Sequence, residues 1–233
     1  MYPLIDTDII YEDNHIVGIN KHPGHIVQGD RTGDMPLSEL LKIYLRKKYN
    51  KPGNVFAGVI HRLDRPVSGV VLFAKTSKAL ARMHMLFKEK TIQKTYWAIV
   101  KNKPVKDSGT IKNYLLKNER LNKSFVVPAD TVGASLSELH YKIIASSDNY
   151  YLIEVNPITG RHHQIRVQLS NLGCPIKGDQ KYGGFRSEPD GSIFLHARKI
   201  QFLHPVKNEP VEVIANPPKN SLWDFFMSNL QNK

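Results

Sequence analysis

The sequence has only one cysteine, Cys174, among its 233 residues. One thiol excludes an internal disulfide and a zinc site built from cysteines, and it is typical of a protein in a reducing cytoplasm. No apolar run approaches the roughly 18 residues of a membrane-spanning helix. The first residues also lack a basic region followed by an apolar one, the pattern of a secretory signal. We therefore expect a cytoplasmic protein that makes no membrane contact.

Several motifs of common enzymes are also missing. The sequence contains neither of the glycine-rich loops that bind nucleotide phosphates, and Ser68-Gly69 lacks the surroundings of a serine hydrolase nucleophile. Histidines are present, but no H-E-x-x-H motif or carboxylate-rich group accompanies those at positions 61, 162, 163, 196 and 204. We therefore expect neither a metal ion nor a cofactor.

Acidic residues are few compared with basic ones. The chain has 33 Lys and Arg against 21 Asp and Glu, a formal net charge of +12, and its pI is about 9.6. This excess favours a polyanionic partner, because each neutralised phosphate releases condensed counterions. Nucleic acid is the first candidate, and a basic surface that only aids solubility is the alternative. Charge alone does not distinguish RNA from DNA.

The order of apolar patterns predicts an α+β fold. Short strand-like segments follow one another without the regular strand and helix alternation of a parallel, doubly wound sheet. Helical patterns are expected at residues 37–45, 77–90, from Thr159 or Gly160 to 172, and 221–230. Strands are expected at residues 9–11, 16–19, 57–60, 70–74, 95–100, 109–116, 124–127, 137–145, 150–155, 194–202 and 210–214. With no repeat or linker visible, we expect one domain over residues 1–233 with a mixed or antiparallel sheet.

The best candidate for a catalytic group is Asp64. It lies in the segment His61-Arg62-Leu63-Asp64-Arg65-Pro66-Val67-Ser68-Gly69, between two strand-like runs. Pro66 restricts the backbone and Gly69 allows unusual angles, which predicts a stiff turn. A sheltered carboxylate beside arginines can stay ionised and act as a nucleophile or base. Taken alone, the segment favours a turn residue or a surface ion pair over a catalytic role for Asp64.

Four separated motifs add to this segment, in order along the chain. Lys94-Thr95-Tyr96-Trp97-Ala98-Ile99-Val100 follows the Asp64 segment. Gly160-Arg161-His162-His163-Gln164-Ile165-Arg166-Val167 then leads to Gly178-Asp179-x-x-Tyr182-Gly183 and Leu195-His196-Ala197. These motifs join the Asp64 segment, its continuation Phe73-Ala74-Lys75-Thr76, and the opening Tyr11-Glu12-Asp13 and Lys21-x-Pro23-Gly24. Together they resemble the RluA family of pseudouridine synthases over about residues 9 to 214, and the Asp64 segment resembles its catalytic motif. Four motifs in register are highly specific.

The resemblance implies a mixed α+β domain with a largely antiparallel central sheet, flanking helices and a central active-site cleft. It implies an isomerase that converts uridine in structured rRNA or tRNA to pseudouridine without a cofactor. Asp64 would act at the ribose, Tyr96 would stack on the target base, and Arg166 would pair with Asp64. Arg62 would insert beside the flipped nucleotide, and we expect His61, Arg65 and Arg161 to contact RNA as well.

Other interpretations stay open beside this resemblance. Taken singly, Tyr96 is a strand aromatic and Arg166 a helix-surface arginine. The rival functions are a non-catalytic RNA-binding or ribosome-assembly factor on the same scaffold, and an N-glycosidase that releases the base. We also expect a monomer without an S4 RNA-binding domain, because few residues precede residue 9. RNA recognition would then lie within the catalytic domain or on its basic rim.

Overall fold

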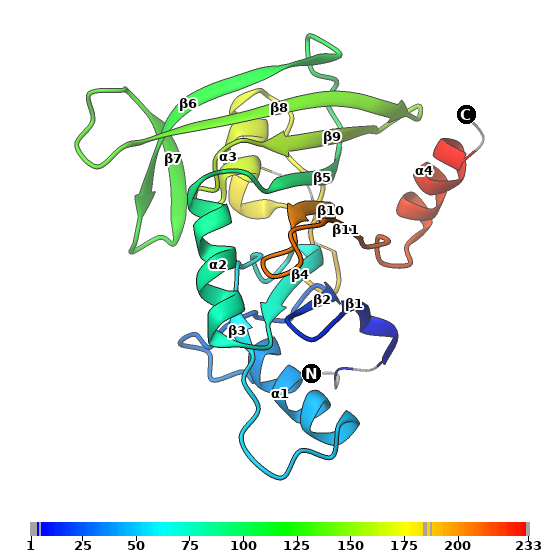
Figure 1. Ribbon diagram of the computed structural model, residues 1–233. Helices are drawn as coiled ribbons and strands as arrows, with labels where there is room; N and C mark the ends of the chain where they lie inside the picture. Colours follow the sequence, from blue (N-terminus) through cyan, green and yellow to red (C-terminus); the bar gives the residue numbers. More distant parts are fainter. Residues whose placement is uncertain (1–3, 5, 184–185, 187, 232–233) are drawn as a thin grey trace. The chain divides into compact units, whose positions relative to one another are not determined.

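The computed structural model describes residues 4, 6–183, 186 and 188–231. The chain forms two compact units (Figure 1). Unit 1 comprises residues 1–93 and 197–216, and unit 2 comprises residues 94–196 and 217–233. Within the described ranges, no helix is both long enough and apolar enough to cross a membrane.

Unit 1 is a sheet with two helices. Strands β1, β2 and β4 pair antiparallel in that order, β10 lies next to β4, β11 pairs with β10, and the short β3 pairs with β4. The strands are β1 (Ile9–Glu12), β2 (Ile16–Lys21), β3 (Gly58–Val59), β4 (Ser68–Ala74), β10 (Leu195–Leu203) and β11 (Pro210–Ile214). The helices are α1 (Leu37–Lys48) and α2 (Ser77–Lys88), and η1 (Asp6–Asp8) is a short 3-10 turn.

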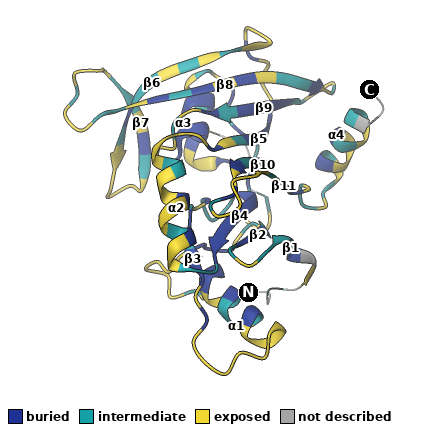
Figure 2. Ribbon diagram, viewed as in Figure 1, coloured by how far each residue is buried: buried dark blue, intermediate teal, exposed yellow. Residues whose placement is uncertain are grey.

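The core of unit 1 is built around β4. All seven residues of this strand are buried (Figure 2), as expected for a continuous apolar run that is covered on both faces. Leu72 packs in one cluster with Met83 of α2 and Val213 of β11. The helix itself begins after Thr76, whose hydroxyl accepts a hydrogen bond from the Ala79 amide at 3.1 Å. The N-cap is thus Thr76, one residue before the Ser77 that apolar periodicity suggests.

Unit 2 holds a second set of antiparallel strands, in the order β5-β9-β8-β6-β7. They are β5 (Gln93–Val100), β6 (Ser108–Asn118), β7 (Lys123–Val127), β8 (Ser135–Ser146) and β9 (Tyr151–Pro157). The helices are α3 (Gln164–Asn171) and α4 (Ser221–Gln231), with the 3-10 turn η2 (Gln180–Tyr182). Helix α3 contacts β6 and β7, and α4 contacts β8.

The expected start of the third helix at Thr159 or Gly160 is wrong, because α3 begins at Gln164. The Gln164 side chain accepts hydrogen bonds from the Thr159 hydroxyl at 2.7 Å and the Arg161 amide at 3.0 Å. These bonds tie the residues before the helix to its first side chain. His163 then has a φ of 54°, a left-handed conformation that stops the helix from extending backwards.

The α+β class and the largely antiparallel pairing expected from the sequence are confirmed. All strands expected from the apolar patterns are present, with bounds shifted by a few residues. The single catalytic domain over residues 1–233 and the central cleft stay predictions.

Candidate active site

The Asp64 segment is a tight turn between β3 and β4. The Val67 amide donates to the Asp64 carbonyl at 3.1 Å, which closes the turn, and the Gly24 amide donates to the Arg65 carbonyl at 2.9 Å. Asp64 itself is half-buried. The turn therefore has its backbone fixed at both sides while its carboxylate stays within reach of solvent.

Gly69 fixes the far end of this turn. Its φ is 114°, and a Cβ atom built on it would lie 2.3 Å from the backbone oxygen of Ala197 on β10. No larger residue fits there, because that distance is well inside van der Waals contact. The stiff turn expected from Pro66 and Gly69 thus has a second cause, the close approach of β10.

The turn rests on a buried ammonium group, Lys21 at the end of β2. Only 1% of this residue is exposed. Its Nζ donates to the carbonyl oxygens of His22 at 3.0 Å, Arg65 at 3.0 Å and Val67 at 2.6 Å. Three acceptors match the three donors of a protonated lysine. Lys21 belongs to the motif Lys21-x-Pro23-Gly24, but the sequence does not indicate its structural role, because the burial of a lysine is not visible in sequence.

Two opposing effects act on the charge of Lys21. Burial lowers its pKa to about 7; the nearby Asp64 carboxylate opposes this shift and Arg65 adds to it. The Asp64 carboxylate therefore has a cationic neighbour on β2, outside its own loop.

The other predicted residues of unit 1 have local partners. His61 Nε2 accepts a hydrogen bond from the Leu72 amide at 3.1 Å, and its ring lies against Phe87. Arg65 contacts Asp34 at 2.7 Å and Asp30 at 3.6 Å. These contacts hold the start and middle of the turn in place. Arg62, in contrast, is exposed.

Tyr96 lies on β5, opposite Val155 of β9. It is half-buried, whereas its neighbours Thr95 and Trp97, which point to the other face, are buried. Lys94 lies two residues earlier, on the same face as Tyr96, and burial lowers its pKa. Tyr96 therefore combines a fixed backbone with a ring that is partly accessible, next to a basic side chain.

Arg166 is held by a buried carboxylate. Its Nε donates to Asp179 Oδ2 at 2.6 Å and its Nη2 donates to Asp179 Oδ1 at 2.8 Å. Arg166 is 5% exposed and Asp179 is 1% exposed, so the alternative of a helix-surface arginine is wrong. A bidentate pair fixes the plane of the guanidinium as well as its charge. Asp179 is a positioning residue that the motif contained but sequence reasoning did not single out.

Tyr182 completes the surroundings of Arg166. The guanidinium carbon lies 5.2 Å from the centre of the Tyr182 ring. The Tyr182 oxygen accepts from the Ser124 amide at 2.8 Å and lies 2.9 Å from His163 Nδ1. Burial lowers the pKa of His163 to about 2, and the positive Arg166 acts in the same direction. His163 is therefore neutral across the working pH range and can accept the tyrosine proton in a hydrogen bond.

The predicted residues thus fall into two groups. His61, Arg62, Asp64 and Arg65 share one loop of unit 1, while Tyr96, Arg161 and Arg166 belong to unit 2. Arg161 is exposed beside α3, with its Nε 3.4 Å from the Leu136 carbonyl. Within the described parts of the chain, no three His, Cys, Asp or Glu side chains gather as metal ligands would. The groups available for chemistry are the Asp64 carboxylate, the Tyr96 side chain on its strand and the buried Arg166 guanidinium.

The sequence of this chain is similar to those of a known protein family. The family described as RNA pseudouridylate synthase matches residues 15–171. The ribosomal large subunit pseudouridine synthase C of Rickettsia prowazekii (strain Madrid E) is 37% identical over 212 residues, which are 90% of this chain and 68% of that protein. Its counterpart from Vibrio vulnificus (strain CMCP6) is 35% identical over 213 residues, 89% of this chain and 64% of that protein.

Solved structures show the same fold. Human RNA pseudouridylate synthase domain containing 4 has a TM-score of 0.78 at 23% identity, covering 97% of this chain and 93% of its own. Human RNA pseudouridylate synthase domain containing 1 has a TM-score of 0.71 at 24% identity, covering 97% and 95%. At this identity the likeness concerns the fold alone. From the family match and the relatives above 30% identity, the chain belongs to the RluA-type family and is an RNA pseudouridine synthase enzyme.

Proposed function

We propose that this enzyme isomerises specific uridines of large-subunit ribosomal RNA, with Asp64 as its catalytic carboxylate. The relatives named for the large ribosomal subunit support that RNA over tRNA. The observation that carries the role of Asp64 is its place on a turn whose backbone is bound by the buried Lys21 ammonium. We propose that the enzyme works as a monomer in the cytoplasm, as expected from the sequence.

The reaction rearranges bonds within one nucleotide. The bond from uracil N1 to the ribose breaks, the base turns, and a bond forms from C5 to the same ribose carbon. The proton on C5 is lost and N1 gains one, so no oxidant, reductant or cofactor is needed. In this proposal Asp64 acts at the ribose while the glycosidic bond breaks.

Tyr96 and Arg166 have separate tasks in this scheme. The Tyr96 ring stacks on the uracil and keeps it in place between its two bonds; such stacking contributes roughly 1–3 kcal/mol per base. The guanidinium of Arg166 offsets negative charge at the Asp64 carboxylate. Arg62, His61, Arg65 and Arg161 contact the RNA around the flipped nucleotide, and flipping is least costly where the RNA is single-stranded.

The test is release of tritium from large-subunit rRNA labelled at uracil C5, because forming the new carbon bond expels that hydrogen. We expect Asp64→Asn to abolish release while RNA binding persists. Asp148→Asn, which removes an exposed carboxylate elsewhere, is the matched control and should keep the wild-type rate.

Three outcomes would contradict the proposal. Wild-type release by Asp64→Asn would remove Asp64 from the mechanism. Free uracil among the products would favour an N-glycosidase, and release from tRNA but not rRNA would change the substrate.

A further inference from the structure

The C-terminal end of α1 carries a basic surface that the proposed chemistry does not use. We call it the α1 basic end, and define it as Arg46, Lys47, Lys48, Tyr49 and Lys51. All five residues are exposed, and Tyr49 is 46% exposed. Concentrated positive charge beside an accessible aromatic ring is the combination that binds nucleic acid by its phosphates and bases.

The chain folds back at this point, which brings Lys51 to the helix end. Asn50 has a φ of 47°. Its amide donates to the Lys47 carbonyl at 3.4 Å, and the Lys51 amide donates to the Arg46 carbonyl at 3.1 Å. This is the Schellman arrangement of a helix C-terminus, here with asparagine in the left-handed position. The turn therefore places one further lysine beside those of the last helical turn.

A half-buried carboxylate anchors this surface by hydrogen bonds. Glu12 of β1 accepts hydrogen bonds from Lys48 at 2.9 Å, Tyr49 at 2.6 Å and Lys75 at 2.9 Å. Burial opposes ionisation of Glu12, but the three hydrogen bonds outweigh it and lower its pKa to about 2. Glu12 is thus charged at neutral pH and fixes the Tyr49 ring against β1.

The single charge of Glu12 leaves most of the positive charge unbalanced. The Nζ atoms of Lys48, Lys51 and Lys75 lie 5.8, 5.8 and 4.8 Å from the centre of the Tyr49 ring. Lysines in a last helical turn also stabilise the helix dipole, which accounts for Lys47 and Lys48 without any ligand. It does not account for Lys51 and Lys75, which lie outside the helix.

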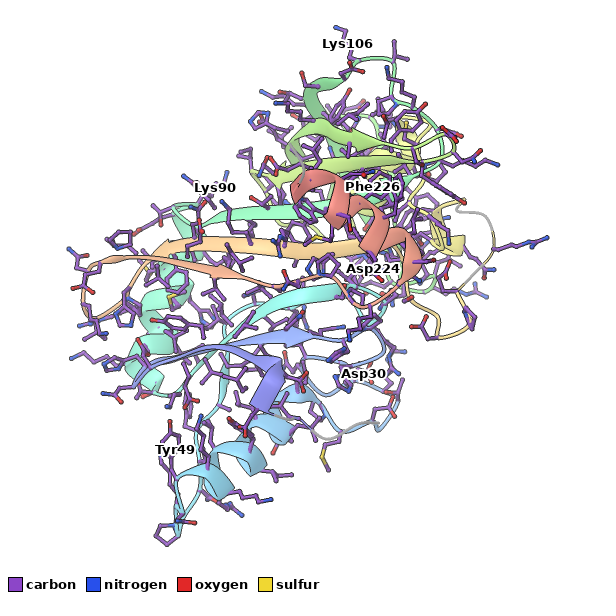
Figure 3. The ribbon with its side chains drawn as sticks, turned by 90° about the vertical axis from the view of Figure 1, so that its right-hand side faces the viewer. Asp30, Tyr49, Lys90, Lys106, Asp224 and Phe226 are labelled. Carbon is purple, nitrogen blue, oxygen red and sulfur yellow. The ribbon has the colours of Figure 1, made fainter. Side chains whose placement is uncertain are left out.

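Helix α1 connects this surface to the Asp64 turn. At its other end, the Leu37 amide donates to the Ile26 carbonyl at 2.8 Å, shortly after the Gly24 that binds the turn. Figure 3 shows Asp30, which lies 3.6 Å from Arg65, at the opposite end of α1 from Tyr49. A helix of 12 residues is about 18 Å long. One RNA molecule is long enough to reach both ends.

We propose that the α1 basic end binds the phosphate backbone of the substrate RNA, one helix length of about 18 Å from the end of α1 that follows Ile26 and Asp30. The inference rests on the proposed function, because that function supplies RNA as the partner. The site tethers the RNA and takes no part in the chemistry. It therefore affects how tightly RNA is held and not how fast a bound uridine reacts.

The test compares two triple variants that remove the same charge. Arg46→Gln/Lys47→Gln/Lys51→Gln changes the α1 basic end but leaves the bonds to Glu12 intact. Lys78→Gln/Lys88→Gln/Lys90→Gln removes three exposed lysines on or just after α2. Both are measured with deproteinised large-subunit rRNA, for binding at several salt concentrations and for single-turnover tritium release over a range of enzyme concentrations.

We expect the first variant to need roughly tenfold more enzyme for half-maximal rate, with the maximal rate unchanged. Its plot of log affinity against log salt should be shallower by about 2, since slopes are close to 0.7–0.9 per phosphate contact. The α2 variant should change both quantities much less. Equal effects of the two variants, or a lower maximal rate for the first, would overturn the inference. Absence of tritium release by the wild type would reject the proposed function instead. The binding curves of the two variants would still show whether the α1 basic end binds RNA.

Discussion

Two buried charged side chains, Lys21 in unit 1 and Arg166 in unit 2, are each satisfied by several hydrogen bonds. Lys21 has three carbonyl acceptors, and Arg166 has both oxygens of Asp179. A buried charge is tolerated only with such partners, and removing one side leaves the other unsatisfied. Each group therefore supports the position of its neighbours as well as its own.

Replacing Lys21 with Met tests its role in holding the Asp64 turn. The apolar side chain has a similar length but removes the donor of the His22 and Val67 carbonyls, while the Arg65 carbonyl keeps the Gly24 amide. Each buried carbonyl left unsatisfied costs about 1–3 kcal/mol. We expect the single-turnover rate to fall at least roughly tenfold, while the affinity for rRNA changes little. Lys78→Met, at an exposed position on α2, is the control for loss of a lysine. An unchanged rate in Lys21→Met would show that the turn holds its shape unaided.

Replacing Asp179 with Asn tests the buried pair with Arg166. Breaking such a pair from one side costs about 3–5 kcal/mol of unfolding free energy, which denaturant titration would measure. The control is Glu188→Gln, whose partner Lys177 is 25% exposed at its side chain; it should cost about 0–1 kcal/mol. A similar loss of unfolding free energy in both variants would contradict the larger contribution expected of the buried pair.

The double variant Arg166→Met/Asp179→Leu separates stability from activity. Removing both charges together should recover most of the stability lost in Asp179→Asn, because no buried charge is left unpaired. The double variant should nevertheless release no tritium, since Arg166 is proposed to act beside Asp64. Recovery of activity together with stability would make Arg166 a purely structural residue.

At the scale of elements, the approach of β4 to β10 determines the geometry of the candidate site in unit 1. Strand β4 begins at Ser68, immediately after the turn, and its second residue is Gly69. The backbone of Ala197 occupies the space where a side chain at position 69 would lie. The position of the turn is therefore coupled to a strand that is distant in the sequence.

Gly69→Ala should destabilise the protein by about 3 kcal/mol or more, because the added methyl group overlaps backbone atoms and alanine is strained at a φ of 114°. Thermal unfolding would measure the change. Gly53→Ala adds the same methyl group where no atom lies within 4 Å, and it should change the stability by less than about 0.5 kcal/mol. Equal melting temperatures for the two variants would show that the β10 backbone moves away from the added methyl group at little cost in stability.

At the scale of the whole molecule, the net charge of +12 favours binding to a polyanion such as RNA. Basic residues occur in both units, so the charge is not confined to one loop. Neutralising phosphates releases counterions, and this makes binding depend strongly on salt. We therefore expect many weak phosphate contacts to add to those at the target uridine.

Binding to large-subunit rRNA should weaken steeply as salt increases. If the enzyme contacts about six phosphates, the affinity should fall roughly a thousandfold between 50 and 200 mM salt. Filter binding or fluorescence anisotropy over that range would give the slope. A nearly flat dependence would mean that the positive charge serves solubility, the alternative that composition left open.

The sequence alone was sufficient for the fold class, the order of the strands along the chain and the family. Alternation of apolar residues predicts strands locally, and motifs such as those around Asp64 and Arg166 are contiguous, so neither depends on distant contacts. The bounds of β11 and the presence of α4 follow for the same reason.

Only the tertiary structure decided which charges are buried and what holds them. In the sequence Lys21 is an ordinary lysine at a strand end, and only the structure shows that the Arg65 and Val67 carbonyls accept hydrogen bonds from it. Arg166 looks like a surface residue until Asp179, thirteen positions later, binds it. The start of α3 likewise depends on the side-chain bonds of Gln164. In each case the physical reason is the same. The residue is buried and hydrogen-bonded by other segments of the chain, and neither periodicity nor motif spacing shows that these segments lie next to it.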